Sequence, residues 1–338
     1  MTFLSHFGGV TDVSQIVVIA FETDISESEL KIKMPLLAQI LDFQPLTLLE
    51  IMKVHAAIES PIDMDALAFL SQYADGVEKQ QLELFGTDQA AYLEAISQGL
   101  VWIDLMEKFP SLRGSVSLET ILKHMPVQHP RSYSVSSSRG LLGKSTVQLC
   151  VGRYLFSGGG INRVGVCSNF LSLAPPGTPV RILFETNRDF HLPSKATAPI
   201  FLVCAGTGVA PMRGLVQERM AYANRGLSLG PAMLLVGFRS KREALFVDEF
   251  NRARACGALS SVLYVFSREG VKKERVNTCI RDNMFARALL KKILNDDEAH
   301  AYICGSADMA TEVIEAIKTV FGPKVVSDMI SSGRVHQV

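Results

Sequence analysis

The chain has 338 residues, of which 48% are hydrophobic, and its 34 basic and 34 acidic side chains leave no formal net charge. This length and composition exclude a disordered chain and predict about two domains of roughly 100–200 residues each. The balanced charge argues against nucleic acid as a partner, since general nucleic-acid binders carry a basic surface. The six cysteines form no CxxC or Cys/His cluster, so we expect reduced thiols, no metal site and a cytoplasmic location.

The apolar runs of this sequence are short. The N-terminal residues lack the basic region and cleavage site of a signal peptide, and the apolar run at residues 16–21 is too short to cross a bilayer. We therefore expect no membrane anchor in this chain.

Helical periodicity dominates the first third of the chain. Apolar residues recur three or four positions apart in Leu46–Ala57, Met64–Tyr73, Val77–Phe85 and Gln89–Phe109. Thr87 or Asp88 is suited to cap the last of these helices, and Pro110 to end it. This third is predicted to be an α-rich module.

The pattern changes between residues 126 and 193. Short β-type runs at Tyr133–Val135, Val147–Val151 and Val180–Glu185 are separated by glycine and proline clusters. This arrangement predicts part of an antiparallel β-barrel.

Strands and helices alternate after Pro193. Strands are expected at residues 200–204, 233–238, 261–266 and 300–304, with helices at 213–224, 243–256, 280–294 and 308–321. Repeated β-α units of this kind predict a doubly wound parallel sheet.

A glycine-rich turn, Gly206-Thr207-Gly208, follows the first of these strands and leads into a helix. Glycines let the backbone approach a ligand closely, and the N-terminus of a helix offers free N–H groups to a phosphate. The turn is a candidate nucleotide loop, although a ligand-free turn has the same local pattern.

The third strand ends at Ser267 and Arg268, and Lys272, Lys273 and Arg275 follow closely. Ligands of open α/β sheets bind outside the carboxyl ends of the strands, where a hydroxyl and several cations suit the 2′-phosphate of NADP. The alternative is a solvated basic loop.

Two further candidates carry redox chemistry. Cys304 ends the fourth strand at the same predicted edge, although a buried cysteine is often only a small packing residue. Arg131, Tyr133 and Ser134 offer a cation, an aromatic ring and a hydroxyl, and Gly165–Ser168 opens a predicted helix. Together these groups suit a flavin and its pyrophosphate.

The order of motifs carries a family resemblance. The motifs are RSYS at 131–134, GVCS at 165–168, FHLP at 190–193, GTGVAP at 206–211, SRE at 267–269 and YICG at 302–305. In this order they resemble the FAD/NADP(H) half of the diflavin reductases, a family that includes NADPH-cytochrome P450 reductase, methionine synthase reductase and nitric oxide synthase. The helical third resembles the connecting domain of that family.

The resemblance implies a fold and its boundaries. It implies a ferredoxin-NADP reductase-like FAD barrel with a helical connecting insertion, followed by a doubly wound NADP(H)-binding sheet. Residues 1–125 are then the connecting region with part of the barrel, 126–193 the FAD-binding barrel, and 194–338 the NADP(H)-binding domain.

The resemblance also implies roles for individual residues. Ser134 and Cys304 become the catalytic residues, placed near the flavin N5 and the nicotinamide. The FAD-binding residues become Arg131, Tyr133, Ser134, Tyr154, Gly165, Val166, Cys167 and Ser168. The NADPH-binding residues become Gly206, Thr207, Gly208, Arg239, Ser267, Arg268, Lys273 and Asn277. Arg275 and Asn277 stand where the family usually has tyrosine and glutamine.

The implied function is hydride transfer from NADPH to FAD, with electrons passing onward to an FMN domain in trans or another redox-protein acceptor. No segment resembles an FMN domain, so we expect this chain to bind FAD and NADPH but not FMN. The opening barrel strands and the usual C-terminal aromatic residue are not recognisable. The sequence around 186–193 looks more like methionine synthase reductase, whereas the helical region is shared with P450 reductase.

Two alternatives stay open. One is a truncated, non-catalytic NADP(H)-binding module or regulatory fragment that retains FAD weakly, which the unrecognised barrel strands favour. The other is a stand-alone ferredoxin-NADP reductase, which has no need of the helical insertion.

Overall fold

The computed structural model describes residues 16–17, 36, 46–270 and 273–338. Contacts divide the chain into two compact units, and each is described by itself. The first comprises residues 1–131 and 153–169, and the second comprises 132–152 and 170–338. The boundaries at residues 125 and 193 stay a prediction.

The first unit is mainly helical, as predicted. Its strands are β1 (Ile16–Val17), β2 (Leu46–Thr47), β3 (Leu155–Gly158) and β4 (Ile161–Val164). Its α-helices are α4 (Leu48–Glu50), α5 (Met64–Leu70), α6 (Gly76–Thr87), α7 (Gln89–Ser97), α8 (Leu105–Lys108) and α9 (Leu118–His124), and a π-helix covers Ile51–His55. Trp102 and Phe109 are among the largest side chains buried in their shared core.

Side-chain caps explain where the helices of this unit begin. The carboxylates of Asp63 and Asp88 accept hydrogen bonds from the backbone N–H groups of Ala66 and Ala91, at 2.7 and 2.8 Å. Such caps satisfy N–H groups that have no partner within the helix. Of the two residues predicted as the cap, Thr87 and Asp88, the structure shows that Asp88 caps α7.

The single helix predicted over residues 89–109 is wrong. Helix α7 ends at Ser97 and α8 begins at Leu105, with Gly99 at a φ of +87° between them. A left-handed glycine ends a helix without steric cost, whereas the apolar spacing continues through the turn and conceals the break.

Glycines allow the β3–β4 hairpin to lie directly against the helical core. The hairpin is antiparallel, with Ser157 opposite Asn162. A Cβ atom at Gly159, which has a φ of +56°, would lie 2.4 Å from the carbonyl oxygen of Gln98. The turn therefore has no room for a side chain at this position.

Replacing Gly159 with alanine is expected to lower the free energy of unfolding by about 2–4 kcal/mol, from backbone strain and overlap with Gln98. Gly160→Ala is the matched control, since Gly160 has a φ of +77° but nothing within 4 Å of its added Cβ. The control is expected to lose only about 1 kcal/mol. Denaturant unfolding of both variants measures the two losses in free energy of unfolding. Equal losses would contradict a packing role for Gly159.

The second unit contains a five-stranded parallel sheet in the order β7-β6-β5-β8-β9. The strands are β5 (Ile200–Ala205), β6 (Ala232–Phe238), β7 (Ser261–Phe266), β8 (His300–Cys304) and β9 (Val335–Gln337). Its helices include α10 (Arg139–Leu142), α12 (Val209–Asn224), α13 (Val247–Ala255), α14 (Val276–Asp282), α15 (Met284–Leu294), α16 (Ala307–Phe321) and α17 (Pro323–Ser331). Helix α11 (Val166–Leu173) crosses the boundary between the units. The predicted doubly wound sheet is confirmed.

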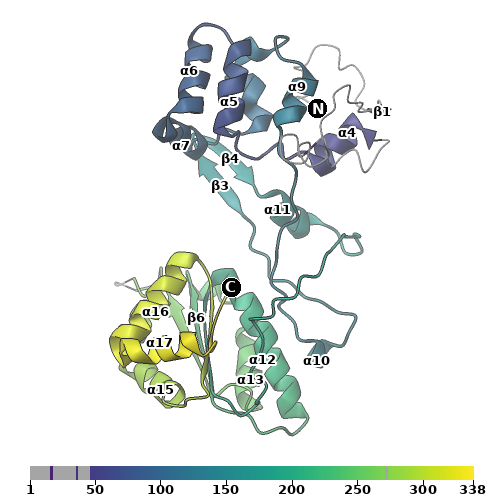
Figure 1. Ribbon diagram of the computed structural model, residues 1–338. Coiled ribbons are helices and arrows are strands. Elements are labelled where there is room, and N and C mark those ends of the chain that lie inside the picture. The colour runs from purple at the N-terminus through teal and green to yellow at the C-terminus, as the bar shows by residue number, and fades with distance from the viewer. Residues whose placement is uncertain (1–15, 18–35, 37–45, 271–272) are drawn as a thin grey trace. The chain divides into compact units, whose positions relative to one another are not determined.

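Helices cover both faces of this sheet, so its central strands are apolar throughout. Alternate residues of β5 face opposite layers: Phe201 and Val203 pack in the core with α14–α17, and Ile200 and Leu202 in the core with α12 and α13. Figure 1 shows α16 and α17 on one side of β6 and α12 and α13 on the other. The carboxyl ends of the strands meet at one edge.

Some elements of the second unit differ from the prediction. The helix predicted over 280–294 is divided at Asn283, whose side chain accepts from the Ala286 N–H at 3.0 Å and so caps α15. Helix α17 and strand β9 were not predicted. Strand β9 is only three residues long, and its neighbour β8 determines that it is a strand.

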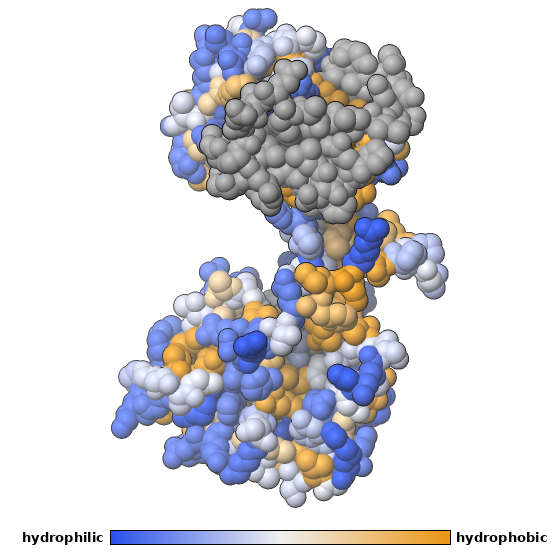
Figure 2. Space-filling view, turned by 45° about the vertical axis from the view of Figure 1, so that its right-hand side comes forward, coloured by the Kyte–Doolittle hydropathy of each residue, from blue (hydrophilic) through white to orange (hydrophobic). Residues whose placement is uncertain are grey.

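None of the three predicted barrel strands is formed in the described residues. Within 133–151, only Val135 and Leu149 form an isolated antiparallel bridge, and 180–185 is not a strand. Alternating apolar residues form a strand only where a neighbour accepts their backbone hydrogen bonds, whereas Leu183 is 79% exposed and Phe184 is 65% exposed. In Figure 2, hydrophobic residues (orange) lie on the surface next to hydrophilic residues (blue).

A histidine cluster joins the last strand to its neighbour. His300 Nδ1 on β8 lies 2.9 Å from His336 Nε2 on β9, and His336 Nδ1 contacts the carbonyl oxygen of Asp189. The two histidine rings are stacked, and the ring of His336 also stacks on Tyr302. His336 Nδ1 donates to the Asp189 carbonyl, and when both rings are neutral the His336 Nε2 atom accepts from the His300 Nδ1–H.

Stability is expected to fall by about 1–2 kcal/mol between pH 6.5 and pH 4 because of this cluster. Burial, then the neighbouring His336, Arg334 and His191, lowers the pKa of His300 from 6.5 to about 4, and burial also lowers the pKa of His336. In that interval the unfolded chain takes up protons that the folded chain excludes. Thermal unfolding of His300→Gln should show a flatter pH dependence than wild type, whereas the exposed His129→Gln should not.

No helix in the part of the chain that the structure describes is both long and apolar enough to cross a membrane.

Candidate functional site

The predicted nucleotide loop joins β5 to α12 at the carboxyl edge of the sheet. Gly206 has a φ of +57°, and a Cβ atom at Gly208 would lie 2.3 Å from the carbonyl oxygen of Cys304. Only glycine allows this approach between the loop and β8. A 3-10 turn at Gly206–Gly208 leads into α12, and the Val209 N–H already donates to the carbonyls of Gly206 and Thr207, so the positive end of the helix dipole lies at this loop and favours an anion.

A pocket of about 390 Å³ opens at this loop, within the second unit. It is lined by Ser132, Tyr133, Ser134, Cys150, Gly152, Ala205, Thr207, Gly208, Ala210, Cys304, Gly305 and Ser306. The RSYS, GTG and YICG motifs, more than 70 residues apart in the sequence, therefore meet at one pocket. Both residues predicted to be catalytic, Ser134 and Cys304, are among its lining.

Cys304 is a protonated thiol at the wall of the pocket. Its side chain is 7% exposed, and its Cα pairs in register with that of Cys204 on the neighbouring strand. Burial raises the pKa of Cys304 to about 11 and also raises the pKa of Cys204. At neutral pH Cys304 therefore presents a neutral S–H group to the pocket.

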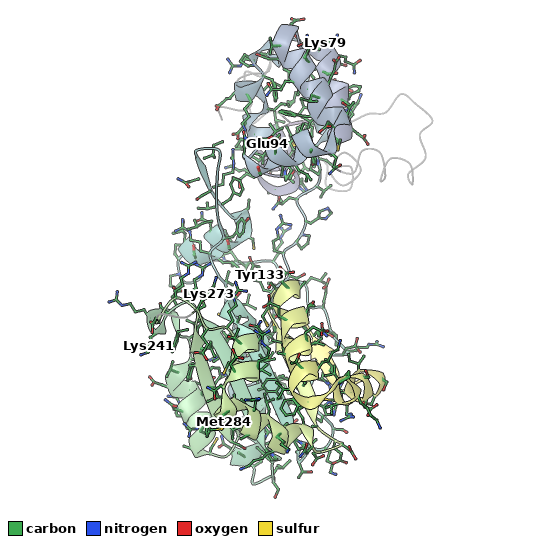
Figure 3. All side chains as sticks on the ribbon, turned by 90° about the vertical axis from the view of Figure 1, so that its left-hand side faces the viewer. Lys79, Glu94, Tyr133, Lys241, Lys273 and Met284 are labelled. Atoms are coloured by element: carbon green, nitrogen blue, oxygen red, sulfur yellow. The ribbon has the colours of Figure 1, made fainter. Side chains whose placement is uncertain are left out.

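The cations predicted to hold a phosphate lie on loops at the same edge. The backbone N–H groups of Ser267 and Arg268 donate to the carbonyls of Phe238 and Arg239, at 2.9 and 2.8 Å, so the loops after β6 and β7 are joined. Arg239, Arg268 and Lys273 are exposed and Ser267 is half-buried. Figure 3 shows Lys273 and Tyr133 toward one end of the sheet and Met284 toward the other.

Glu269 and Glu312 offset part of this positive charge. The Glu269 carboxylate accepts from the Lys241 backbone N–H at 2.6 Å and lies 4.0 Å from the Lys241 ammonium. Arg275 lies 3.8 Å from Glu312. In the described chain no ion pair is recorded for Arg239, Arg268 or Lys273, whose charges face solvent.

Asn277 lies buried at the start of α14. It is 7% exposed, and its Oδ1 atom has no hydrogen-bond partner among the described residues. A buried acceptor without a partner is costly unless a ligand or water donates to it. This position therefore fits a ligand that brings a hydrogen-bond donor.

The remaining predicted FAD residues belong to the first unit. The Ser168 hydroxyl accepts from the Tyr154 N–H at 3.1 Å, and the Gly165 N–H donates to the Tyr154 carbonyl at 2.9 Å, so the start of α11 is joined to Tyr154. Tyr154 is 62% exposed, and Arg131 and Val166 are exposed too. Cys167 is half-buried next to Ser168.

Part of the pocket was not predicted from the sequence. Cys150, Gly152 and Ser306 are not among the predicted site residues, yet they line the pocket. In the structure, the bridge between Val135 and Leu149 brings the residues after Leu149 alongside the RSYS motif. A pairing of this kind cannot be read from single-strand periodicity.

Comparison with known proteins agrees with this geometry. Residues 10–170 match the FAD binding domain family, and residues 202–315 match the oxidoreductase NAD-binding domain family. The chain carries FAD- and NAD(P)H-binding oxidoreductase domains like those in the reductase half of nitric oxide synthase and P450 reductase. The family resemblance predicted from the motifs is therefore confirmed.

Individual relatives come from the same group. A nitric oxide synthase-like protein of Bombyx mori is 33% identical over 252 residues, which is 73% of this chain and 22% of that protein. Nitric oxide synthase 3 of Sus scrofa is 30% identical over 298 residues, 86% of this chain and 24% of that protein. A bifunctional cytochrome P450/NADPH-P450 reductase of Acremonium egyptiacum is 28% identical over 285 residues, 82% of this chain and 25% of that protein.

The chain spans about a quarter of the length of these relatives. The residues of the second unit fit a nicotinamide dinucleotide, because the pocket at the nucleotide loop, the positive dipole end of α12 and the orphaned oxygen of Asn277 match its flat, anionic and donor groups. In the described part of the chain no group of three or more His, Cys, Asp or Glu side chains could hold a metal ion.

Proposed function

We propose that this chain is an NADPH-dependent flavoprotein reductase that moves a hydride from NADPH to FAD and electrons onward to a redox-protein acceptor. The observation that supports this most is the pocket in which Tyr133, Ser134, Thr207 and Cys304 meet. NADPH and FAD supply the hydride chemistry when bound, whereas the protein supplies orientation and electrostatics.

The residues of the pocket then have distinct roles. Gly208 lets the nucleotide loop pack against the end of β8, and Thr207, at the positive end of the α12 dipole, binds phosphate oxygens. Tyr133 covers a flat ring, and the Ser134 hydroxyl lies at the reacting edge of that ring. The neutral thiol of Cys304 contacts the nicotinamide without adding a charge to the transfer site.

The exposed cations determine the choice of nicotinamide coenzyme in this proposal. Arg239, Arg268 and Lys273 with the hydroxyl of Ser267 bind the 2′-phosphate, which NADPH has and NADH lacks. Guanidinium groups form paired hydrogen bonds with phosphate oxygens, and Lys273 adds a point charge. Asn277 accepts a hydrogen bond from the same end of the coenzyme.

The FAD-binding part rests on the family match to residues 10–170. We propose that Arg131 and the start of α11, with Gly165, Val166, Cys167 and Ser168, bind the FAD pyrophosphate, and that Tyr154 contacts the adenine end. The β3–β4 hairpin and the Val135–Leu149 bridge support an FAD barrel in residues 126–193, followed by the NADP(H)-binding domain from residue 194.

The acceptor is proposed by analogy with the relatives. These relatives are nitric oxide synthases and a bifunctional cytochrome P450/NADPH-P450 reductase. We propose that electrons leave through an FMN-containing domain or protein in the cytoplasm, as in methionine synthase reductase or P450 reductase.

The visible absorption spectrum of the purified protein, before and after anaerobic NADPH, tests the proposal. We expect an oxidised-flavin spectrum that bleaches when NADPH is added. A colourless protein that binds NADPH but takes up no added FAD would instead support the alternative, a non-catalytic NADP(H)-binding module.

A further inference from the structure

Two segments of the second unit form one wall of the pocket. We call this the RSYS wall: it consists of Ser132–Ser134 on one segment and of Cys150 and Gly152 on the other. The segments are joined further back, where the Ser136 N–H donates to the Gln148 carbonyl at 2.8 Å. The position of the wall therefore depends on what holds this junction.

A buried guanidinium holds the junction. Arg213 on α12 is 9% exposed, and its Nη1 donates to the Ser136 carbonyl oxygen at 3.0 Å and to Gln148 Oε1 at 2.7 Å. The backbone of α12 comes close here, since a Cβ atom at Gly214 would lie 3.3 Å from the carbonyl oxygen of Val135. One side chain thus binds both segments at once.

The guanidinium itself has a single orientation. Its Nε donates to both carboxylate oxygens of Glu249 at 3.0 Å, and its Nη2 donates to Glu249 Oε2 at 2.9 Å. Its carbon lies 4.5 Å from the centre of the Phe246 ring. Phe246 has a left-handed backbone with a φ of 58°, which is costly for a bulky residue and persists only where its surroundings require it.

A second bridge runs parallel to Arg213. Gln217, one turn along α12, donates to Glu249 Oε1 at 2.7 Å and accepts from the Ser138 N–H at 2.9 Å. Glu249 is therefore shared by both bridges. A planar donor with several fixed hydrogen bonds restrains direction as well as distance, which a lysine cannot do.

Helix α12 also begins at the nucleotide loop, which forms another part of the pocket lining. This nucleotide wall comprises Thr207, Gly208 and the end of β8 at Cys304. The helix that carries Arg213 is therefore common to both walls. Hydride transfer needs its two partners at a fixed separation, and an error of about 1 Å can cost about 100-fold in rate.

We propose that Arg213 is a positioning residue of the transfer site: it fixes the RSYS wall, with Tyr133 and Ser134, against the nucleotide wall, with Cys304. The proposal rests on the proposed reductase function. Arg213 does not line the pocket and acts only through the segments that it binds.

The same helix provides a matched control. Arg219 is 2% exposed, and it donates to the carbonyl oxygens of Gly230 and Ala258 at 2.5 and 2.8 Å. These carbonyls precede β6 and β7, at the end of the sheet away from the nucleotide loop. Arg219→Lys therefore also removes a buried guanidinium from α12, one that binds two carbonyls, without touching the RSYS wall.

The experiment compares Arg213→Lys with Arg219→Lys in the FAD-loaded full chain. We expect Arg213→Lys to slow single-turnover flavin reduction by about 100-fold and Arg219→Lys to leave the rate within about threefold. The dissociation constant of NADP⁺, measured by calorimetry, should stay within about threefold in both variants, because the nucleotide wall is intact. Equal rates in the two variants would overturn the proposal.

Hydrogen exchange gives a readout that needs no cofactor. Peptides covering residues 132–152 should exchange faster in Arg213→Lys than in Arg219→Lys, which should instead loosen the chain near Gly230 and Ala258. Gln148→Met keeps the ion pair of Arg213 with Glu249 and removes only one acceptor, so it tests the link in a stable protein. Unchanged exchange at 132–152 in both Arg213→Lys and Gln148→Met contradicts the proposal, even if wild type fails to reduce FAD and the proposed function is wrong.

Discussion

Replacing Cys304 with alanine should slow the reduction of FAD by NADPH about 100-fold, while the dissociation constant of NADP⁺ changes by less than about threefold. The thiol lines the pocket at the end of β8, and the backbone of Gly208 packs against its carbonyl. Its removal leaves a gap where the nicotinamide is proposed to lie, so the ring is held less closely. The phosphate contacts that provide most of the affinity stay in place. Stopped-flow absorbance measures the rate, and calorimetry measures the affinity.

Cys204→Ala is the control for this experiment. Cys204 pairs in register with Cys304, is fully buried in the same core, and does not line the pocket. Both substitutions remove one sulfur atom and should lower the melting temperature to a similar extent. Only Cys304→Ala should slow the reaction. If rate and affinity fall equally in Cys304→Ala, the residue is a packing residue as its burial alone would suggest.

Removing the cations of the proposed 2′-phosphate site should weaken the preference for NADPH over NADH. We expect the double variant Arg268→Ala, Lys273→Ala to reduce the ratio of kcat/KM for NADPH over NADH by about 100-fold, since each charged hydrogen bond contributes about 1.5–3 kcal/mol before solvent screening. The effect should fall almost entirely on NADPH, because NADH has no phosphate at that position. Steady-state kinetics with both coenzymes measures the ratio.

Lys291→Ala, Lys292→Ala is the matched control, because these lysines are exposed on α15. It removes the same net charge and should leave the ratio unchanged. The preference of wild type should also weaken as salt concentration rises, because the cations are exposed and their field is screened. An unchanged ratio in the Arg268, Lys273 variant would exclude this loop from the phosphate site.

The α/β half could be predicted in most of its detail because its signals are local. Buried parallel strands such as Ile200–Ala205 and Ala232–Phe238 read as short apolar runs, and the amphipathic α16 has its own periodicity. The order of the RSYS, GTG and YICG motifs was sufficient to predict the family, which the domain matches confirm. These features depend on neighbours within a few residues, so the sequence by itself determined them.

Only the tertiary structure decided what depends on distant partners. Whether residues 180–185 form a strand depends on a neighbour that accepts hydrogen bonds, which their alternating pattern cannot specify. Cys150 reached the pocket through the pairing of Val135 with Leu149, and Arg213 became the link between two walls through contacts with residues 65 and 77 positions away. Pairings over such separations arise from the packing of whole elements, and no local periodicity records them.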